Sequence, residues 1–168
     1  GATGHTAYYF FKKLEESGFE GKIKVVVRKD SDSVFLKSLP FEIDFCVGDL
    51  SDEEFLEKIL MDVETVLHIA DIRLSEKIVQ VGKKLGVKWF VLVHTTGRYS
   101  KYKSAAEIYI QIEDRLLSSY SNLTILRPTM IYGSKKDRNI WKLINFIGKN
   151  KLFPIFGQGK NLMQPVHA

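Results

Sequence analysis

Short apolar runs rich in valine and isoleucine alternate with amphipathic segments along this chain, and this alternation constrains the fold more than any other feature. The apolar runs lie at residues 22–28, 41–46, 65–70, 89–93 and 123–126. The segments between them repeat apolar side chains at helical spacing, as in residues 9–14, 55–60, 78–85 and 108–116. Nearly continuous apolar strands indicate a parallel sheet covered on both faces. We therefore predict an α/β fold with a doubly wound parallel sheet.

The length and composition fit one folded domain. The chain has 168 residues, of which 45% are hydrophobic, and no Pro- or Gly-rich linker divides it. We predict a single domain over residues 1–168. The chain opens on a glycine turn of the kind that follows a strand, and it ends within a segment. We therefore expect a first, central strand and a C-terminal substrate region to be missing from it.

The charge is weakly basic and spread along the chain. The formal net charge is +5 with a pI near 9.2, and the lysines are scattered among acids rather than gathered in a basic block. This pattern disfavours nucleic-acid binding and suits a small phosphate-bearing ligand better.

Cys46 is the single cysteine of the sequence, so no disulfide framework can form. A reduced, cytoplasmic location follows. The sequence has neither an apolar run of membrane-spanning length nor an export signal. No grouping of histidine, cysteine and acidic residues has metal-ligand spacing. We therefore expect no membrane contact and no metal.

A glycine-rich turn opens the chain and leads directly into a helical segment. Gly1 and Gly4 allow a tight turn and a close approach of the backbone to a pyrophosphate, and Ala7 is small enough for close helix packing. The free N–H groups of the helix N-terminus would receive the negative charge, with His5 and Thr6 beside them. The turn thus indicates a dinucleotide site. The alternative is a purely structural loop with an exposed turn histidine, because such a loop before a helix looks the same.

The apolar run at residues 22–28, which follows the glycine turn, ends in an arginine at the position where these folds recognise the ribose. This residue is Arg28, and arginine suits a 2′-phosphate through its planar, bidentate guanidinium. An acid at that place would favour a free 2′-hydroxyl. We therefore predict NADP, with NAD as the alternative. In that alternative Arg28 is a solvated charge at the strand end, and Asp30 contacts the ribose.

Several further motifs occur in the order of one superfamily. They are the Gly-x-x-Gly-x-x-Ala turn at residues 1–7, Gly-Asp-Leu at 48–50, a strand end at 66–70 and Leu-Arg-Pro-Thr-Met-Ile-Tyr-Gly at 126–133. With these motifs the chain resembles the extended and atypical short-chain dehydrogenase/reductases, including the NAD-dependent epimerase/dehydratase family and the nitrogen-metabolite-repressor-like branch. The resemblance implies a Rossmann-type NAD(P)-binding fold. It also implies that the adenine lies beside Asp49 and Leu50, and the nicotinamide beside Ala70, Pro128 and Thr129.

The resemblance breaks at the residues that perform redox chemistry in this superfamily. Catalytic members use a serine or threonine, for which Thr95 or Thr96 is available, and a tyrosine followed four residues later by a lysine. The lysine charge lowers the phenol pKa from about 10, so that the phenol exchanges a proton near neutral pH. Here Glu113 follows Tyr109, and a carboxylate has the opposite effect on a phenol. A second alignment puts Tyr109 at the lysine position and Ala105 at the tyrosine position, so that both catalytic residues are replaced.

Loop residues just upstream offer a displaced acid or cation. Tyr99, Tyr102 and Lys103 lie there, although tyrosines beside lysines are common on protein surfaces. The catalytic candidates are therefore Thr95, Thr96, Tyr99 and Tyr109.

Three functions stay open on these residues. The first is an NAD(P)-dependent oxidoreductase or epimerase/dehydratase-like protein that acts on a small molecule, and relatives of this kind often form homodimers. The second is a regulator or scaffold that binds the dinucleotide without turning it over, which the loss of the tyrosine–lysine pair favours. The third is an α/β domain without a nucleotide, because fold alone does not fix function.

The remaining conspicuous side chains have structural explanations. His68 and His94 lie in apolar strand contexts, where a buried, hydrogen-bonded histidine is more common than a ligand. Trp89 and Trp141 occupy strand and helix positions, so we predict that they pack in the core. The amphipathic segment 139–147 is predicted to cover the sheet or the missing C-terminal part, with a partner surface as the alternative.

Overall fold

The computed structural model describes all residues except 101–102, 136, 138–139, 154, 156 and 161–162. The chain forms two compact units, Gly1–Arg127 and Pro128–Ala168. A single domain over residues 1–168 stays a prediction.

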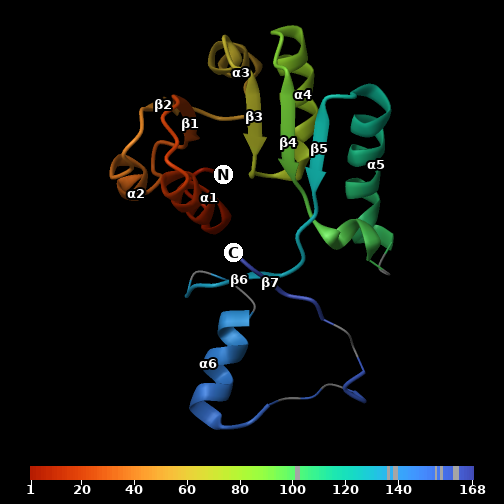
Figure 1. The fold of residues 1–168 in the computed structure, drawn as a ribbon. Coiled ribbons are helices and arrows are strands. Elements are labelled where there is room, and N and C mark those ends of the chain that lie inside the picture. The colour runs from red at the N-terminus through yellow and green to blue at the C-terminus, as the bar shows by residue number, and fades with distance from the viewer. Residues whose placement is uncertain (101–102, 136, 138–139, 154, 156, 161–162) are drawn as a thin grey trace. The chain divides into compact units, whose positions relative to one another are not determined.

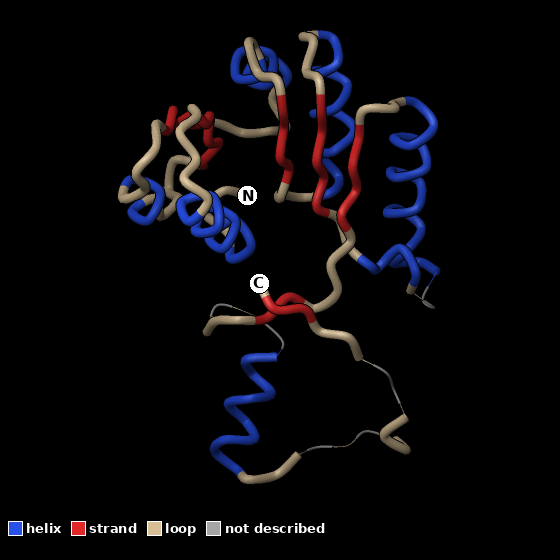
Figure 2. The backbone as a smooth tube through the Cα atoms, in the orientation of Figure 1, coloured by secondary structure: helices blue, strands red, loops and turns tan. Residues whose placement is uncertain are grey.

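The larger unit alternates strands and helices in the predicted order (Figures 1 and 2). Its elements are α1 (His5–Glu16), β1 (Ile23–Val27), α2 (Val34–Lys37), β2 (Ile43–Val47), α3 (Glu53–Leu60), β3 (Thr65–His68), η1 (Ile72–Leu74), α4 (Ser75–Lys84), β4 (Trp89–Val93), η2 (Thr96–Tyr99), α5 (Lys103–Ser119) and β5 (Leu123–Leu126). Strand β1 pairs with β2, and β3, β4 and β5 pair in that order, all of them parallel. The predicted α/β fold with parallel strands is confirmed. The short helix α2 and the 3-10 turns η1 and η2 are additions to the predicted elements.

Strands β1 and β3 each keep one edge that pairs with no other strand among the described residues. The chain enters beside one of these edges, because Gly1 lies against the backbone of Ile69, just after β3. A first, central strand between the two edges stays a prediction.

Apolar clusters hold the helices of the larger unit on its strands. One cluster joins α4 and α5 to β4 through Val79, Ile112, Leu116, Phe90 and Leu92. Another joins α1 and α2 to β1 through Ala7, Phe11, Leu36, Val25 and Val27, and a third joins α3 to α4. Helices α3 and α4 therefore bury the apolar side that their sequence spacing predicts. In α1 and α5 the spacing is only partly right, because Phe10 and Ile108 are exposed.

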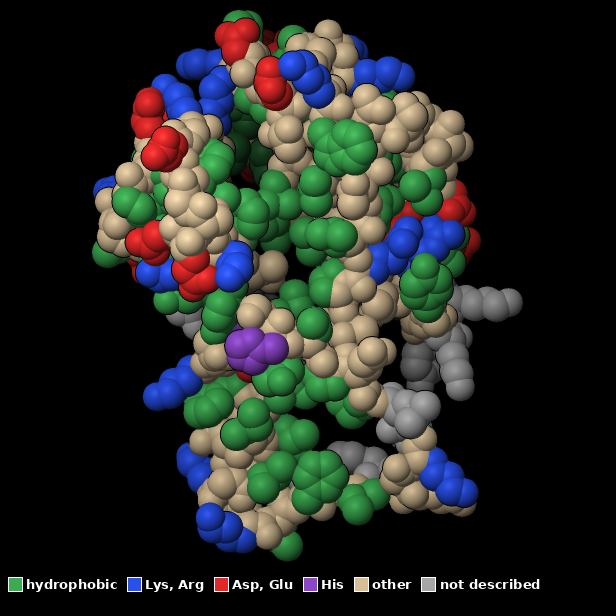
Figure 3. Space-filling view, viewed as in Figure 1, with side chains coloured by type: hydrophobic (Ala, Val, Ile, Leu, Met, Phe, Trp, Pro, Cys, Tyr) green, Lys and Arg blue, Asp and Glu red, His purple; other side chains and the backbone are tan. Residues whose placement is uncertain are grey.

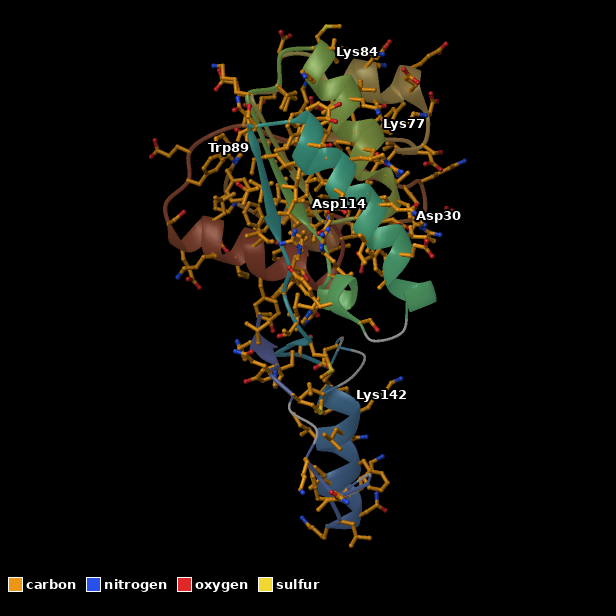
Figure 4. All side chains as sticks on the ribbon, turned by 90° about the vertical axis from the view of Figure 1, so that its right-hand side faces the viewer. Asp30, Lys77, Lys84, Trp89, Asp114 and Lys142 are labelled. Atoms are coloured by element: carbon orange, nitrogen blue, oxygen red, sulfur yellow. The ribbon has the colours of Figure 1, made fainter. Side chains whose placement is uncertain are left out.

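The prediction that Trp89 packs in the core is wrong. Trp89 is 45% exposed, whereas Phe90 and Leu92 beside it are buried. Side chains alternate between the faces of a strand, and Phe90 and Leu92 take the face that α4 and α5 cover. Trp89 lies on the other face, where its Nε1–H donates to Thr124 Oγ1 on β5 at 3.2 Å (Figure 4). Apolar side chains show on the surface there (Figure 3).

The smaller unit contains β6 (Ile131–Tyr132), α6 (Ile140–Asn150) and β7 (Val166–His167), and β6 pairs with β7 in parallel. Helix α6 begins under a side-chain cap, because Asp137 Oδ1 accepts from the Trp141 N–H at 2.7 Å. Trp141 is half-buried rather than buried. Ile144 and Phe146 of this helix are exposed, so a covering role for the segment 139–147 stays a prediction.

Asp52 gives a direct test of local helix stability. Its Oδ1 accepts from the N–H groups of Glu54 and Phe55 at 3.0 and 3.3 Å and so caps α3. We expect Asp52→Ala to lower the free energy of unfolding by about 1 kcal/mol, as measured in urea. Asp52→Asn keeps an acceptor and should lose much less. Equal losses in the two variants would contradict the capping role.

Candidate functional site

The predicted site residues of the larger unit gather at the carboxyl ends of its strands. Arg28 follows β1, Asp49 and Leu50 come after β2, Ala70 after β3 and Thr95 after β4. Figure 1 shows β1 and β2 on one side of the two open edges and β3, β4 and β5 on the other. In open α/β sheets, ligands bind outside the carboxyl ends of the strands, at the point where the strand order reverses. The chain enters through its glycine turn near that point.

The glycine turn touches the end of β3 directly. A Cβ atom on Gly1 would stand 2.4 Å from the carbonyl oxygen of Ile69, so no other residue fits there without a backbone shift. The Gly4 N–H donates to the Gly1 carbonyl at 2.9 Å and closes the turn. Gly4 is also the N-cap of α1 and provides no capping side chain. The first N–H groups of α1 therefore remain available to a ligand.

His5 adds a polar atom that lacks a partner. Its Nε2 is shielded from solvent and has no hydrogen-bond partner among the described residues. Its ring packs edge-on against Tyr9, with 5.1 Å between the ring centroids. Leaving a buried donor unpaired costs free energy. A phosphate oxygen bound at this turn would supply the missing acceptor, so the turn fits the predicted pyrophosphate.

Arg28 lies exposed in the turn after β1. Its backbone N–H donates to Ser31 Oγ at 3.2 Å, and among the described residues no ion pair holds its guanidinium. Asp30 is exposed in the same turn (Figure 4). An unpaired guanidinium next to the glycine turn suits a phosphate group.

Asp49 and Leu50 follow the neighbouring strand. Asp49 Oδ1 accepts from the N–H and from the hydroxyl of Ser51, both at 2.8 Å. These hydrogen bonds lower the pKa of Asp49, and the charge of Arg28 adds to the lowering. Leu50 packs against the cluster that joins α3 to α4. The loop after β2 is therefore ordered by its own side chains.

The predicted catalytic residues surround η2. Thr95 Oγ1 accepts from the Gly97 N–H at 3.1 Å and caps this turn, while Thr96 is half-buried within it. Tyr99 is exposed at its end. Tyr109 comes from α5 and packs on Gly97, where an added Cβ would lie 3.2 Å from its ring. Thr95, Thr96 and Tyr109 thus meet at one loop.

The roles of Tyr102 as a displaced acid and of Lys103 as a displaced cation stay predictions. Tyr102 lies outside the described residues, and so do the side chains of Lys103 and Ala105. Glu113, four residues after Tyr109, binds His94, Arg98 and Arg127.

Sequence reasoning missed a buried charge cluster at this edge, which we call the Glu113 cluster: Ser75, His94, Arg98, Glu113 and Arg127. Glu113 is fully buried. Its Oε2 accepts from Arg127 Nε at 2.9 Å and Arg98 Nη1 at 3.1 Å. His94 Nδ1 lies 2.9 Å from its Oε1, and Ser75 Oγ lies 3.0 Å from His94 Nε2. The arginine of the Leu-Arg-Pro-Thr motif was the one sequence signal for this cluster.

The protonation states in the Glu113 cluster follow from its geometry. Burial raises the pKa of Glu113, but the hydrogen bonds and the charges of Arg127 and His94 together outweigh burial and hold that pKa below its ordinary value. Burial lowers the pKa of His94, in spite of Glu113. A neutral His94 next to a carboxylate donates from Nδ1 and accepts the Ser75 hydroxyl at Nε2. The predicted burial and hydrogen bonding of His94 are confirmed, as are those of His68, whose Nε2 lies 3.0 Å from the Asp71 carbonyl oxygen.

Ser75, His94 and Glu113 are connected like a hydrolase triad. A catalytic serine must reach the substrate carbonyl with its Oγ, and Ser75 is fully buried. Glu113 is also held by two arginines, which reduces its ability to stabilise a protonated His94. This row of hydrogen bonds therefore supports the fold at the strand ends.

Pro128 and Thr129 belong to the smaller unit. The hydroxyl of Thr129 donates to the carbonyl oxygen of Gln164, next to the pairing of β6 with β7. A contact of these two residues with a nicotinamide stays a prediction.

The described residues include neither a candidate metal site nor a candidate membrane span. They contain no group of three histidine, cysteine or acidic side chains that could hold a metal ion. None of the described helices has the length and apolar composition that a membrane span needs.

Comparison with known proteins gives a fold. No family model matches the sequence, and no curated protein matches it. An NADPH-dependent quinone oxidoreductase from Escherichia coli matches with a TM-score of 0.61 and 24% identity, over 76% of this chain and 45% of that one. Triphenylmethane reductase from Citrobacter sp., solved with NADP(H), matches with a TM-score of 0.62 and 21% identity, over 76% of this chain and 47% of that one. A short-chain dehydrogenase/reductase from Veillonella parvula matches with a TM-score of 0.66 and 18% identity, over 80% of this chain and 69% of that one.

The chain spans about half the length of the quinone oxidoreductase and of the triphenylmethane reductase. At these identities the similarity is one of fold. It confirms the Rossmann-type fold that the sequence resemblance implies.

Proposed function

We propose that this Rossmann-type chain, which shares its fold with short-chain dehydrogenase/reductases, binds NADP(H) and belongs to an oxidoreductase acting on a small molecule. The observation that carries the proposal is the series of groups along the carboxyl ends of the strands. An exposed, unpaired guanidinium, a glycine turn opening a helix and a pair of threonines follow one another there.

Each part of NADP then has its own residues. The 2′-phosphate binds Arg28, and the adenine lies beside Asp49 and Leu50. The pyrophosphate binds the N–H groups after Gly1 and Gly4, together with His5 and Thr6. The orphan Nε2 atom of His5 and the uncapped N-terminus of α1 support this assignment. The nicotinamide lies beside Ala70 and Thr95, at the carboxyl ends of β3 and β4.

Bound NADPH supplies the hydride, and the chain orients it and handles the proton. The Thr95 oxygen accepts from Gly97, which leaves its O–H free to donate to a substrate oxygen. Thr96 is the second hydroxyl at this place, and Tyr99 and Tyr109 are the candidate acids. The three solved structures named above support an oxidoreductase, because they are a quinone oxidoreductase, a triphenylmethane reductase and a short-chain dehydrogenase/reductase.

A specific observation also favours the non-catalytic alternative. Tyr109 packs on Gly97, and Glu113 stands where a lysine would complete the catalytic pair. A dinucleotide-sensing regulator or scaffold needs the binding residues but not this pair. An epimerase/dehydratase-like reaction, a cytoplasmic location and a homodimer remain part of the proposal as the sequence predicts them.

The test is a calorimetric titration of NADPH and NADH with the native protein and Arg28→Ala. A charge-assisted contact to phosphate contributes about 1.5–3 kcal/mol, so we expect the variant to bind NADPH about 10- to 100-fold more weakly. NADH affinity should stay nearly constant, because NADH lacks the 2′-phosphate. Lys29→Ala removes the neighbouring exposed cation and is the matched control.

The outcomes separate the candidates. A selective NADPH loss in Arg28→Ala supports the cofactor assignment, and a hydride-transfer screen then separates reductase from sensor. If the native protein binds neither dinucleotide in either redox state, the proposed function is wrong and the glycine turn is structural alone.

A further inference from the structure

We propose that Glu113 is a positioning residue that, through Arg98, fixes the loop presenting Thr95 and Thr96 to the nicotinamide end of the dinucleotide. The inference rests on the proposed function for its ligand. It assigns the arrangement of that loop to a buried carboxylate on the neighbouring helix.

One carboxylate reaches three segments that end at the same edge of the sheet. His94 directly follows β4, Arg98 lies within η2, and Arg127 directly follows β5. Glu113 bonds all three side chains from α5. The backbone also joins the ends of β4 and β5, because the His94 N–H donates to the Leu126 carbonyl at 2.8 Å. The ends of β4 and β5 are therefore tied to one point on α5.

The hydrogen bond between Glu113 and Arg98 is the one that holds η2. Arg98 is also bonded to Asp114 on the surface of α5, with 2.8 Å between Nη2 and Oδ1 (Figure 4). One turn earlier on α5, the Tyr109 ring packs on Gly97. Gly97 and Arg98 are thus both held by α5, and Thr95 caps the same turn. Helix α5 therefore holds the turn that Thr95 caps and that contains Thr96.

Burial makes this arrangement specific. Glu113 is fully shielded, whereas Arg98 and Arg127 keep 21% and 24% of their side chains exposed. A carboxylate without access to water needs its partners in place, and it therefore selects the loop conformation that brings Arg98 to it. The exposed Asp114 has no such need, because water can replace Arg98 as its partner.

The experiment compares Arg98→Met with the native chain, with Arg98→Lys as the conservative variant and Asp114→Asn as the matched control. Arg98→Met keeps Glu113, Arg127 and His94 paired, so the fold should persist, which thermal unfolding checks. The first readout is amide hydrogen exchange of residues 95–100 in the ligand-free protein. The second is the affinity for NADPH and for adenosine 2′,5′-bisphosphate, which has the adenosine and the 2′-phosphate but no nicotinamide.

We expect exchange of residues 95–100 to accelerate about 10-fold in Arg98→Met, with no change in β1 and β2. NADPH affinity should fall about 10-fold while bisphosphate affinity stays constant, because only NADPH reaches the loop. Arg98→Lys should recover part of both effects, and Asp114→Asn should change neither. Unchanged exchange, or equal loss for both ligands, overturns the inference. If the native protein binds neither ligand, the proposed function fails, and the exchange experiment alone decides whether Arg98 holds the loop.

Discussion

Replacing Glu113 by alanine is expected to lower the free energy of unfolding by about 3 kcal/mol, because it leaves the partly buried guanidinium of Arg127 without a carboxylate and removes the buried partner of Arg98, which keeps only the exposed Asp114. The expected loss is at the lower end for buried pairs, since Arg98 and Arg127 retain some contact with water. Urea unfolding at pH 7, with equal m-values for both proteins, measures it.

Two further variants test the cause of that loss. Glu76→Ala removes another carboxylate that pairs with an arginine, Arg115, whose side chain is 58% exposed, and it should change stability less than Glu113→Ala does. Arg127→Met added to Glu113→Ala removes one uncompensated charge and should recover part of the stability. If the double variant loses the sum of the two single losses, charge compensation is not the cause.

Acid should destabilise the larger unit through His68. Burial lowers the pKa of His68 from 6.5 to about 4, because its protonated form is poorly solvated. Well above pH 6.5 the imidazole is neutral in both the folded and the unfolded chain, so it contributes no pH dependence there. Below pH 6.5 the unfolded chain takes up the proton first, and stability falls until the folded protein is protonated near pH 4.

The size of this effect follows from the shift. One pKa unit corresponds to about 1.4 kcal/mol, so His68 alone accounts for about 3 kcal/mol between pH 6.5 and 4. Urea unfolding at closely spaced pH values measures it. His68→Asn cannot titrate and should have a shallower profile by about that amount. The remaining slope of the variant contains the contribution of His94, whose pKa burial also lowers. Identical profiles would show that His68 does not titrate with folding.

Much of the fold could be predicted because its cause is local. The runs at 89–93 and 123–126 are strands with those bounds, and the run at 65–70 forms a strand that ends at His68. Period-two and period-3.6 patterns arise from the geometry of strands and helices, so a single sequence shows them. Trp89 escaped this reasoning, because an apolar run does not tell which face of the strand a helix covers.

The candidate site could be predicted only where a motif carries it. Gly1, Gly4 and Arg28 stand out through the turn and the strand end, and the structure places them on one edge with Asp49, Ala70 and Thr95. Of the Glu113 cluster, only Arg127 stands in such a motif. Its members come from positions 75, 94, 98, 113 and 127, and only the folded chain brings them within hydrogen-bond distance. From its spacing to Tyr109, Glu113 could be recognised only as the residue that replaces the catalytic lysine.

The contact between Gly1 and Ile69 changes how sequence comparisons of this turn should be interpreted. A side chain at position 1 would collide with the Ile69 carbonyl even if no nucleotide ever bound. Selection for folding alone would therefore keep a glycine there in a descendant that had lost its ligand. The informative positions are Arg28, whose side chain is exposed, and His5, whose shielded Nε2 has no partner among the described residues. A homologue that keeps the glycine but replaces both of these residues would be a candidate for a chain that has abandoned the dinucleotide.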